Sequence, residues 1–227
     1  GVTQTYGVST AEVKTLLQQV ARVKDEFKAQ DVFDGAIARL GGSKKLSREY
    51  ATHWAWSGAD GLNYRSAAAV ALGSPELLRR EAQSALTYNS RYSDPKDNAR
   101  LGRQALGQAR QGAATVRAMA LLSQAAHPEK EVVLHRGIAY EQAAAIKEAL
   151  RRGDKEIVIG SGAISSFSAS GTEARKFARG LSRRKGSTEH GVVIKIRAPR
   201  ESIAMSYKAV PSIRGESVKG KKEIAIF

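Results

Sequence analysis

The chain has 227 residues, of which 42% are hydrophobic and 26% charged, and it contains no cysteine. These values are typical of a folded globular chain, and they exclude disulfides, thiolate metal sites and cysteine nucleophiles. No apolar run approaches the roughly 20 residues that a membrane-spanning helix needs.

The net charge of +15 is concentrated in the second half of the chain. Residues 130–227 carry 20 Lys and Arg against 10 Asp and Glu, a balance of +10. Such an excess attracts polyanions or acidic proteins, although solubility and attraction for cofactor phosphates explain it equally well. Nucleic acid is the weaker alternative, because no helix-turn-helix, zinc-finger or aromatic RNA-binding signature accompanies the charge.

The first half of the sequence predicts helices. Ser9-Thr10 is a capping signal for an amphipathic stretch whose apolar residues recur at helical spacing. Further helices are predicted at capping residues, and His127-Pro128 ends the series. The predicted ranges are 11–30, 31–40, 43–56, 76–86 and 96–126, the last with a break near Gly107 or Gly112.

After Pro128 the pattern changes to short strands. Strands are predicted at 132–134, 156–159, 163–168, 192–197, 202–206 and 223–227, with helices at 141–151 and 172–181. Residues 208–222 lack periodicity, which predicts a mobile loop before the last strand. The fold class is therefore α+β. We expect an N-terminal helical region at 1–75 and a domain at 76–227, either separate or packed as one compact unit.

Three segments of the strand-rich half carry candidate chemistry. Leu134-His135-Arg136-Gly137 ends the first strand, hydroxyl groups gather at Ser165 to Ser170, and Glu223 begins the last strand. Each alone has an ordinary explanation: a surface charge, a turn or helix cap, and a solvated strand end. The order of the three is more informative than any one of them.

The order Arg, Ser-x-Ser, Glu resembles the R-S-E class of mono-ADP-ribosyltransferases. Other segments are similar to that class in the same order: Ala85-Leu86-Thr87-Tyr88 with Asn98 to Leu101, Ala174 with Phe177-Ala178, and Val192 to Arg197. The likeness covers about residues 76–227. It implies an ADP-ribosyltransferase-type split β-sandwich preceded by several helices.

The resemblance also implies roles for individual residues. The residues with a catalytic role would be Arg136, Ser166 and Glu223. The substrate NAD would be contacted by Arg136, Gly137, Ser166, Ser168 and Phe177. The resemblance implies no metal. In this picture Arg136 binds the NAD phosphates, Gly137 lets the backbone approach the nicotinamide amide, and Ser166 orients Glu223. The chemistry is consistent, because a guanidinium forks onto phosphate oxygens and a fixed carboxylate stabilises an oxocarbenium-like ribose. His135 should point to the opposite face of its strand from Arg136, where packing or support of the site is expected.

One position departs from the family pattern. Members carry E-x-E or Q-x-E, but here the triplet is Lys221-Lys222-Glu223. Lys221 would stand where the family engages the target side chain, and two like charges about 4 Å apart cost about 4 kcal/mol at an effective dielectric constant of ~20. Glu216 on the same loop is a weaker candidate for the missing acid.

Two functions follow as expectations. The first is an NAD-dependent mono-ADP-ribosyltransferase that modifies a host protein, similar to type III effectors of plant-pathogenic bacteria. Such a protein would be secreted by the bacterium and act as a monomer inside the host cell, and we expect its secretion signal to lie outside this sequence. The alternative is a degenerate pseudo-transferase that binds a host protein segment at the same site without chemistry.

Overall fold

The computed structural model describes residues 8–54, 62–89, 95–138, 140–156, 162–180, 191–211 and 222–227. Among them are eight α-helices, a short 3-10 helix and five strands, so the α+β class is confirmed. The helices are α1 (Thr10–Arg22), α2 (Glu26–Arg39), α3 (Lys44–Trp54), α4 (Leu62–Ala71), α5 (Pro75–Asn89), α6 (Pro95–Ala125), α7 (Tyr140–Arg152) and α8 (Gly171–Gly180). The strands are β1 (Glu131–Ile138), β2 (Ser165–Ser168), β3 (Val192–Pro199), β4 (Ile203–Ser206) and β5 (Glu223–Ile226).

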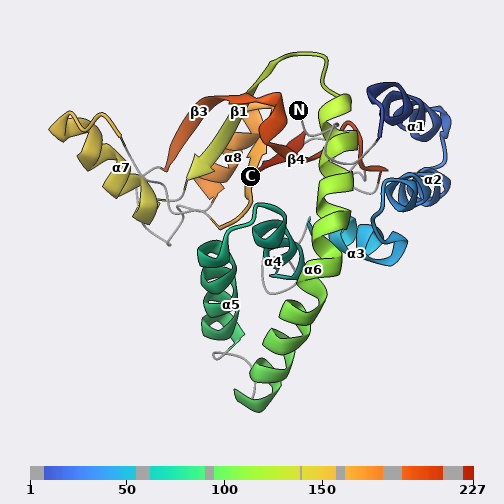
Figure 1. The fold of residues 1–227 in the computed structure, drawn as a ribbon. Coiled ribbons are helices and arrows are strands. Elements are labelled where there is room, and N and C mark those ends of the chain that lie inside the picture. The colour runs from blue at the N-terminus through green and yellow to red at the C-terminus, as the bar shows by residue number, and fades with distance from the viewer. Residues whose placement is uncertain are drawn as a thin grey trace.

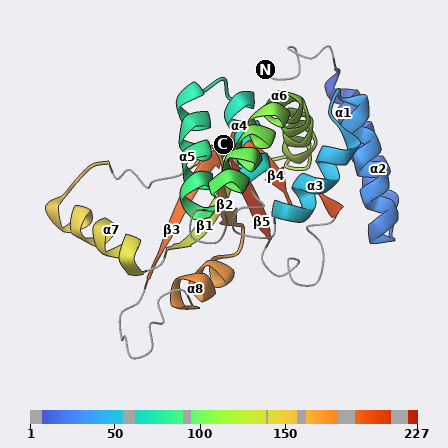
Figure 2. The same cartoon turned by 90° about the horizontal axis from the view of Figure 1, so that it is seen from below.

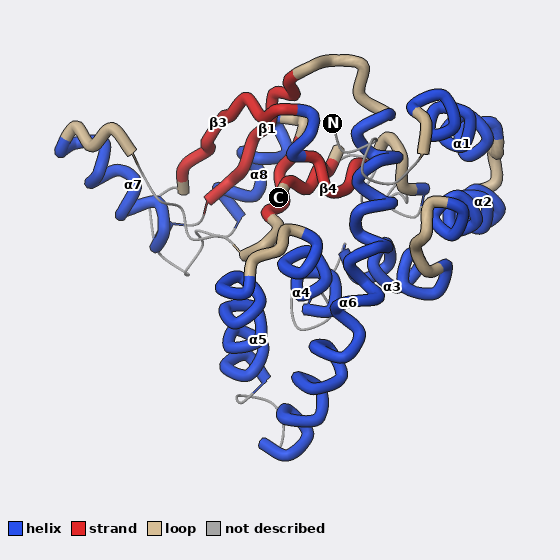
Figure 3. Tube along the Cα trace, viewed as in Figure 1, coloured by secondary structure: helices blue, strands red, loops and turns tan. Residues whose placement is uncertain are grey.

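The five strands form one antiparallel sheet in the order β3-β1-β2-β5-β4. The long helix α6 runs beside the β4 side of this sheet and separates it from α1, α2 and α3 (Figures 1 and 2). Helix α8 packs on β1, and α4 and α5 lie beside the lower half of α6 (Figure 3). The second sheet of a split β-sandwich is not seen among the described residues, and that part of the predicted fold stays a prediction.

Two hydrophobic clusters hold these elements together. The larger contains buried side chains from α1, α2, α3, α4 and α6 together with Met205 of β4 and Ala225 of β5. The smaller lies within the sheet and contains Leu134, Phe167 and Ile224. The larger core therefore crosses the boundary that the sequence predicted at residue 75, and the helices and the sheet share it.

The single helix predicted at 11–30 is wrong, because the structure divides it. Helix α1 ends at Arg22, and the carboxylate of Asp25 accepts a hydrogen bond from the backbone N–H of Lys28 at 2.8 Å. This N-cap starts α2, which then continues through the helix predicted separately at 31–40.

Helix α6 is continuous, so the predicted break near Gly107 or Gly112 is also wrong. Gly112 instead permits close helix packing: a Cβ there would lie 2.1 Å from the Tyr50 hydroxyl and 2.7 Å from Ala67 Cβ. Helix α4 was not predicted at all, and the strand predicted at 156–159 lies almost wholly outside the described residues.

Candidate functional site

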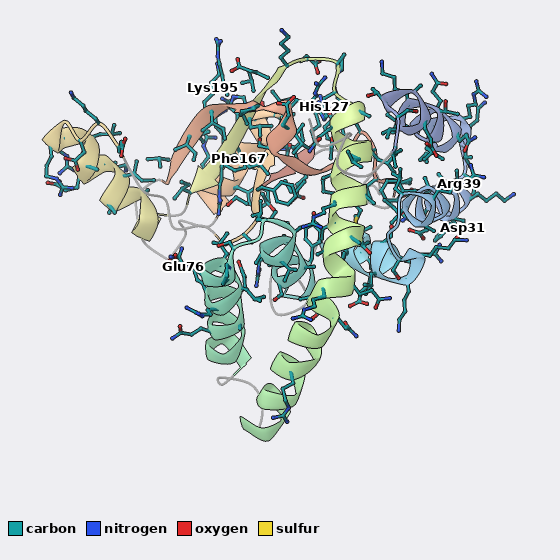
Figure 4. The ribbon with its side chains drawn as sticks, in the orientation of Figure 1. Asp31, Arg39, Glu76, His127, Phe167 and Lys195 are labelled. Atoms are coloured by element: carbon teal, nitrogen blue, oxygen red, sulfur yellow. The ribbon has the colours of Figure 1, made fainter. Side chains whose placement is uncertain are left out.

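The register of the sheet brings four polar residues into one row. Lys195 of β3 is the cross-strand partner of His135 of β1. On the other side of β1, His135 is paired with Ser168 of β2, and Ser168 is paired in turn with Glu223 of β5. Direct cross-strand partners project to the same face with Cβ atoms roughly 5 Å apart. We call Lys195, His135, Ser168 and Glu223 the polar row. Lys195 lies on the edge strand (Figure 4).

The backbone around Glu223 is fixed from both sides. The N–H of Ala169, just after β2, donates to the carbonyl of Lys222 at 3.0 Å, and the N–H of Tyr207, just after β4, donates to the carbonyl of Glu223 at 3.0 Å. Lys222 has a φ of 45°, the left-handed region that costs a non-glycine residue about 1 kcal/mol or more. The half-buried carboxylate of Glu223 is thus presented from a held backbone next to a strained residue.

Ser168, rather than Ser166, is the serine opposite Glu223. Ser168 is buried, and its Oγ accepts a hydrogen bond from the Ser170 N–H at 2.9 Å. Ser170 in turn caps α8 by accepting from the N–H of Glu173. Ser166 is exposed and is the partner of Ala225. The orienting role that the resemblance gave to Ser166 therefore fits Ser168 better, because a direct partner is nearer to Glu223 than a diagonal neighbour.

Arg136 lies on the other face of the sheet. Its neighbour His135 belongs to the polar row, and successive side chains of a strand alternate. The guanidinium carbon of Arg136 lies 5.7 Å from the centre of the Phe167 ring. Phe167 belongs to the hydrophobic cluster of the sheet (Figure 4). The structure therefore does not bring Arg136 and Glu223 together on one face.

The Arg136 side chain nevertheless has the properties of an anion-binding group. It is half-buried, burial lowers its pKa, and it forms no ion pair with any described residue. A guanidinium stays protonated in proteins, so it carries a charge out of water with only an aromatic ring as compensation. An anionic ligand would supply the missing partner.

Strands β1 and β2 are joined by unusually few residue pairs. Only His135 and Ser168 are paired there, whereas β1 is paired with β3 along its whole length and β2 with β5 along its whole length. Arg136 and Gly137 on β1 and Ser166 and Phe167 on β2 lie immediately beyond that single pair. These residues from the two faces thus come together at one end of the β1–β2 contact.

Gly137 has a packing role that explains its lack of a side chain. A Cβ there would lie 2.2 Å from the carbonyl oxygen of Ala174 and 2.6 Å from the nitrogen of Ala178, both backbone atoms of α8. The Cβ of Phe177 is 2.9 Å from the same point, and the Phe177 side chain is 43% exposed. Contact of either residue with NAD stays a prediction.

Two predicted site residues, Lys221 and Glu216, lie outside the described residues. Within the described ranges, no group of three or more His, Asp or Glu side chains could hold a metal ion. No helix in those ranges is long and apolar enough to cross a membrane.

A second polar cluster, at the end of α6, was not predicted from the sequence. Nε2 of His127 is 2.8 Å from Oγ of Ser206, and its Nδ1 is 3.8 Å from a carboxylate oxygen of Glu129. The order Ser, His, Glu is that of a hydrolytic triad. However, Ser206 is fully buried, and its Oγ also accepts from the Lys208 N–H at 3.2 Å. A substrate cannot reach that hydroxyl, so the cluster joins α6 to β4 rather than performing catalysis.

The row also gives His135 a place that sequence spacing did not reveal. The prediction that it points away from Arg136 agrees with the register, but that direction leads to Ser168 and Glu223. Only the strand register could show this, because the three residues are far apart in the sequence. Comparison with known proteins finds no matching family model, no matching curated protein and no matching solved structure.

Proposed function

We propose that the chain is a mono-ADP-ribosyltransferase that binds NAD at the end of the β1–β2 contact and transfers ADP-ribose to a host protein. The observation that carries the proposal is the direct partnership of Ser168 with Glu223, which joins two of the three residue types of the R-S-E pattern. The serine is buried and the glutamate half-buried on a held backbone, as expected for a carboxylate that must be oriented.

NAD matches the charge of Arg136 at this place. Its pyrophosphate is an anion, and Arg136 is a half-buried cation with no acidic partner among the described residues. Because Arg136 and Glu223 lie on opposite faces of the sheet, the proposal requires NAD to reach both faces beside the single β1–β2 pair. In this arrangement Arg136 holds phosphate, Ser168 orients Glu223, and Glu223 stabilises positive charge on the ribose as the bond to nicotinamide breaks.

Calorimetry with NAD tests the proposal first. We expect binding that is weakened at least about tenfold by Arg136→Lys, because an ammonium cannot reproduce the forked contact of a guanidinium with phosphate. The matched control is Arg151→Lys, an exposed arginine of α7 whose replacement should leave the affinity unchanged. Absence of binding at millimolar NAD would refute the proposal.

Turnover is tested separately with labelled NAD and a host-cell lysate. We expect labelled protein bands that Glu223→Gln abolishes, since an amide is isosteric with the carboxylate but has no charge to stabilise the ribose cation. Glu148→Gln, on the exposed surface of α7, is the control that should keep full labelling. Labelling that survives Glu223→Gln would show that another residue performs the chemistry.

A pseudo-transferase that binds a host protein segment at the same site is the second candidate. It is favoured by two adjacent features: a lysine at position 221 in place of the family's acid or amide, and a left-handed Lys222 directly before Glu223. NAD binding without labelling, and no gain of labelling in Lys221→Glu, would favour this candidate.

A further inference from the structure

Strand β3 lies at one edge of the sheet, and its outer side is paired with no other described strand. It is eight residues long and is paired with β1 along its whole length. Helix α8 packs on a face of the sheet rather than along this edge, because a Cβ at Gly137 of β1 would meet the α8 backbone. An open strand of this length presents backbone N–H and C=O groups with which another strand can pair.

The hydrogen-bond pattern identifies the backbone groups that face outward. The N–H of Arg200 donates to the carbonyl of Lys130 at 2.9 Å, so this pair, one step beyond the β1–β3 ladder, is hydrogen-bonded. Hydrogen-bonded and non-hydrogen-bonded pairs alternate along an antiparallel ladder. Counting back from that pair, the residues whose N–H and C=O groups point to the open edge are Val193, Lys195 and Arg197.

The side chains on one face of this edge are cationic and have no acidic neighbour. Lys195 and Arg197 are exposed, and their partners on β1 are His135 and Val133. Neither cation forms an ion pair with a described residue. Helix α8 lies on the same face, and its one acidic side chain is already paired with a lysine of that helix. Carboxylates on an added strand would therefore meet two unpaired cations.

The opposite face of the same edge is apolar. Ile194 and Ile196 are half-buried and pack against the sheet cluster that contains Leu134, Phe167 and Ile224. The part of each isoleucine that stays exposed borders the open edge, because no described strand follows β3 there. Apolar side chains on an added strand would cover this surface and extend the cluster.

We propose that the outer edge of β3 binds an extended acidic segment of a partner protein, which adds one strand to the sheet. Acidic and apolar residues alternate in this segment, because successive side chains of the added strand meet the cations on one face and the isoleucines on the other. A second copy of the chain is a poorer occupant, since two β3 edges would bring their own cations together. Binding requires neither NAD nor Glu223, so the inference is independent of the proposed function.

Calorimetry with synthetic peptides tests the proposal. The probe is a peptide of eight residues, the length of β3, with blocked ends and with Glu and Val in alternation. We expect it to bind. Two peptides of the same length should not bind: one has Lys in place of every Glu, and the other has all its Glu residues before all its Val residues. Equal affinity for the alternating and the grouped Glu–Val peptides would reveal plain charge attraction and overturn the inference.

Charge reversal locates the binding surface. The double variant Lys195→Glu/Arg197→Glu should bind the alternating Glu–Val peptide at least about tenfold more weakly, because two attractive cross-strand pairs become repulsive. The same variant should gain affinity for the alternating Lys–Val peptide, which an unfolded protein would not. The control Lys14→Glu/Lys28→Glu alters two exposed lysines of α1 and α2 and changes the net charge equally. A similar loss of affinity in both double variants would refute this placement.

Amide hydrogen exchange distinguishes an added strand from a contact between side chains alone. In the free protein the N–H groups of Val193, Lys195 and Arg197 should exchange rapidly, and those of Ile194 and Ile196 slowly, because only the isoleucines are hydrogen-bonded to β1. Saturation with the alternating Glu–Val peptide should slow the exchange of the first three. Binding that leaves these three in rapid exchange would contradict strand addition.

Two further results would assign the edge to another occupant. A single-stranded oligonucleotide that binds more tightly than the peptide, and loses that affinity in Lys195→Glu/Arg197→Glu, would identify a nucleic-acid surface. Protection of the three outward amides without peptide, lost when the protein is diluted, would identify a second copy of the chain. Either result would overturn the inference, whereas an absence of NAD binding would overturn only the proposed function.

Discussion

The cluster at the end of α6 predicts a loss of stability in mild acid. Burial lowers the pKa of His127 to about 4, and the nearby Lys208 lowers it further than Glu129 can restore. The side chain is 3% exposed, so solvent does not screen this effect. An unfolded chain has the ordinary histidine pKa of about 6.5.

The sign follows from which state binds the proton. Between pH 6.5 and 4 the unfolded chain protonates His127 and the folded protein does not, so the free energy of unfolding falls as the pH is lowered through this window. A difference of about 2.5 between the two pKa values, at about 1.4 kcal/mol for each pH unit, gives a full loss of about 3.5 kcal/mol. The loss is complete once the pH lies below the folded-state pKa of about 4.

Urea unfolding of the wild type and of His127→Gln at several pH values isolates this contribution. Glutamine has an amide at the position of Nε2 and can keep the bond to Ser206, but it does not titrate. Between pH 7.5 and pH 4 the wild type should lose about 3 kcal/mol more unfolding free energy than His127→Gln does. Glu129→Gln, which alters an exposed carboxylate, should change little at pH 7.5. Parallel pH profiles of wild type and His127→Gln would refute the reasoning.

Two further substitutions have effects that the packing determines, each measurable by urea unfolding. Gly137→Ala should lower the free energy of unfolding by about 1–3 kcal/mol or more, because the new Cβ meets backbone atoms of α8. Gly107→Ala on α6, where a Cβ would have nothing within 4 Å, should raise it by up to about 1 kcal/mol. Equal stability of the two variants would contradict this packing. Glu81→Ala should cost about 2–4 kcal/mol, because the buried carboxylate pairs with Arg65 at 2.9 Å and accepts from the Ala163 N–H at 2.8 Å. Glu76→Ala, an exposed glutamate of the same helix, should cost under about 1 kcal/mol, and a similar loss in both would argue against a special role for Glu81.

The sequence was sufficient for the elements whose signals are local. Ser9 and Ser170 cap helices as predicted, and the strands predicted at 192–197 and 202–206 are present as β3 and β4. Their signals, a capping hydroxyl or a short run of β-branched residues, act within a few residues.

The failures have their cause in tertiary contacts. Gly112 resembles a helix breaker in the sequence, yet it lies against Tyr50 and Ala67, residues 40 or more positions away, and α6 passes through it unbroken. Helix α4 is short of apolar periodicity because three consecutive alanines, Ala67 to Ala69, are all buried between neighbouring helices. A stripe pattern cannot identify a helix that is covered on most sides.

The candidate site illustrates the same division between local and long-range information. The sequence identified β2 as the serine-bearing strand and Glu223 as the start of the last strand, but the resemblance gave the orienting role to Ser166, whereas the cross-strand partner of Glu223 is Ser168. A shift of one residue in register would exchange every side chain between the two faces, and a shift of two would make Ser166 the partner of Glu223. The choice is fixed by the buried partners on the opposite face, Phe167 with Ile224, which belong to the sheet core. Packing of the apolar face therefore determines which hydroxyl lies between His135 and Glu223. Substitutions of Phe167 should alter the placement of Ser168 and Glu223, although Phe167 lies on the opposite face of the sheet.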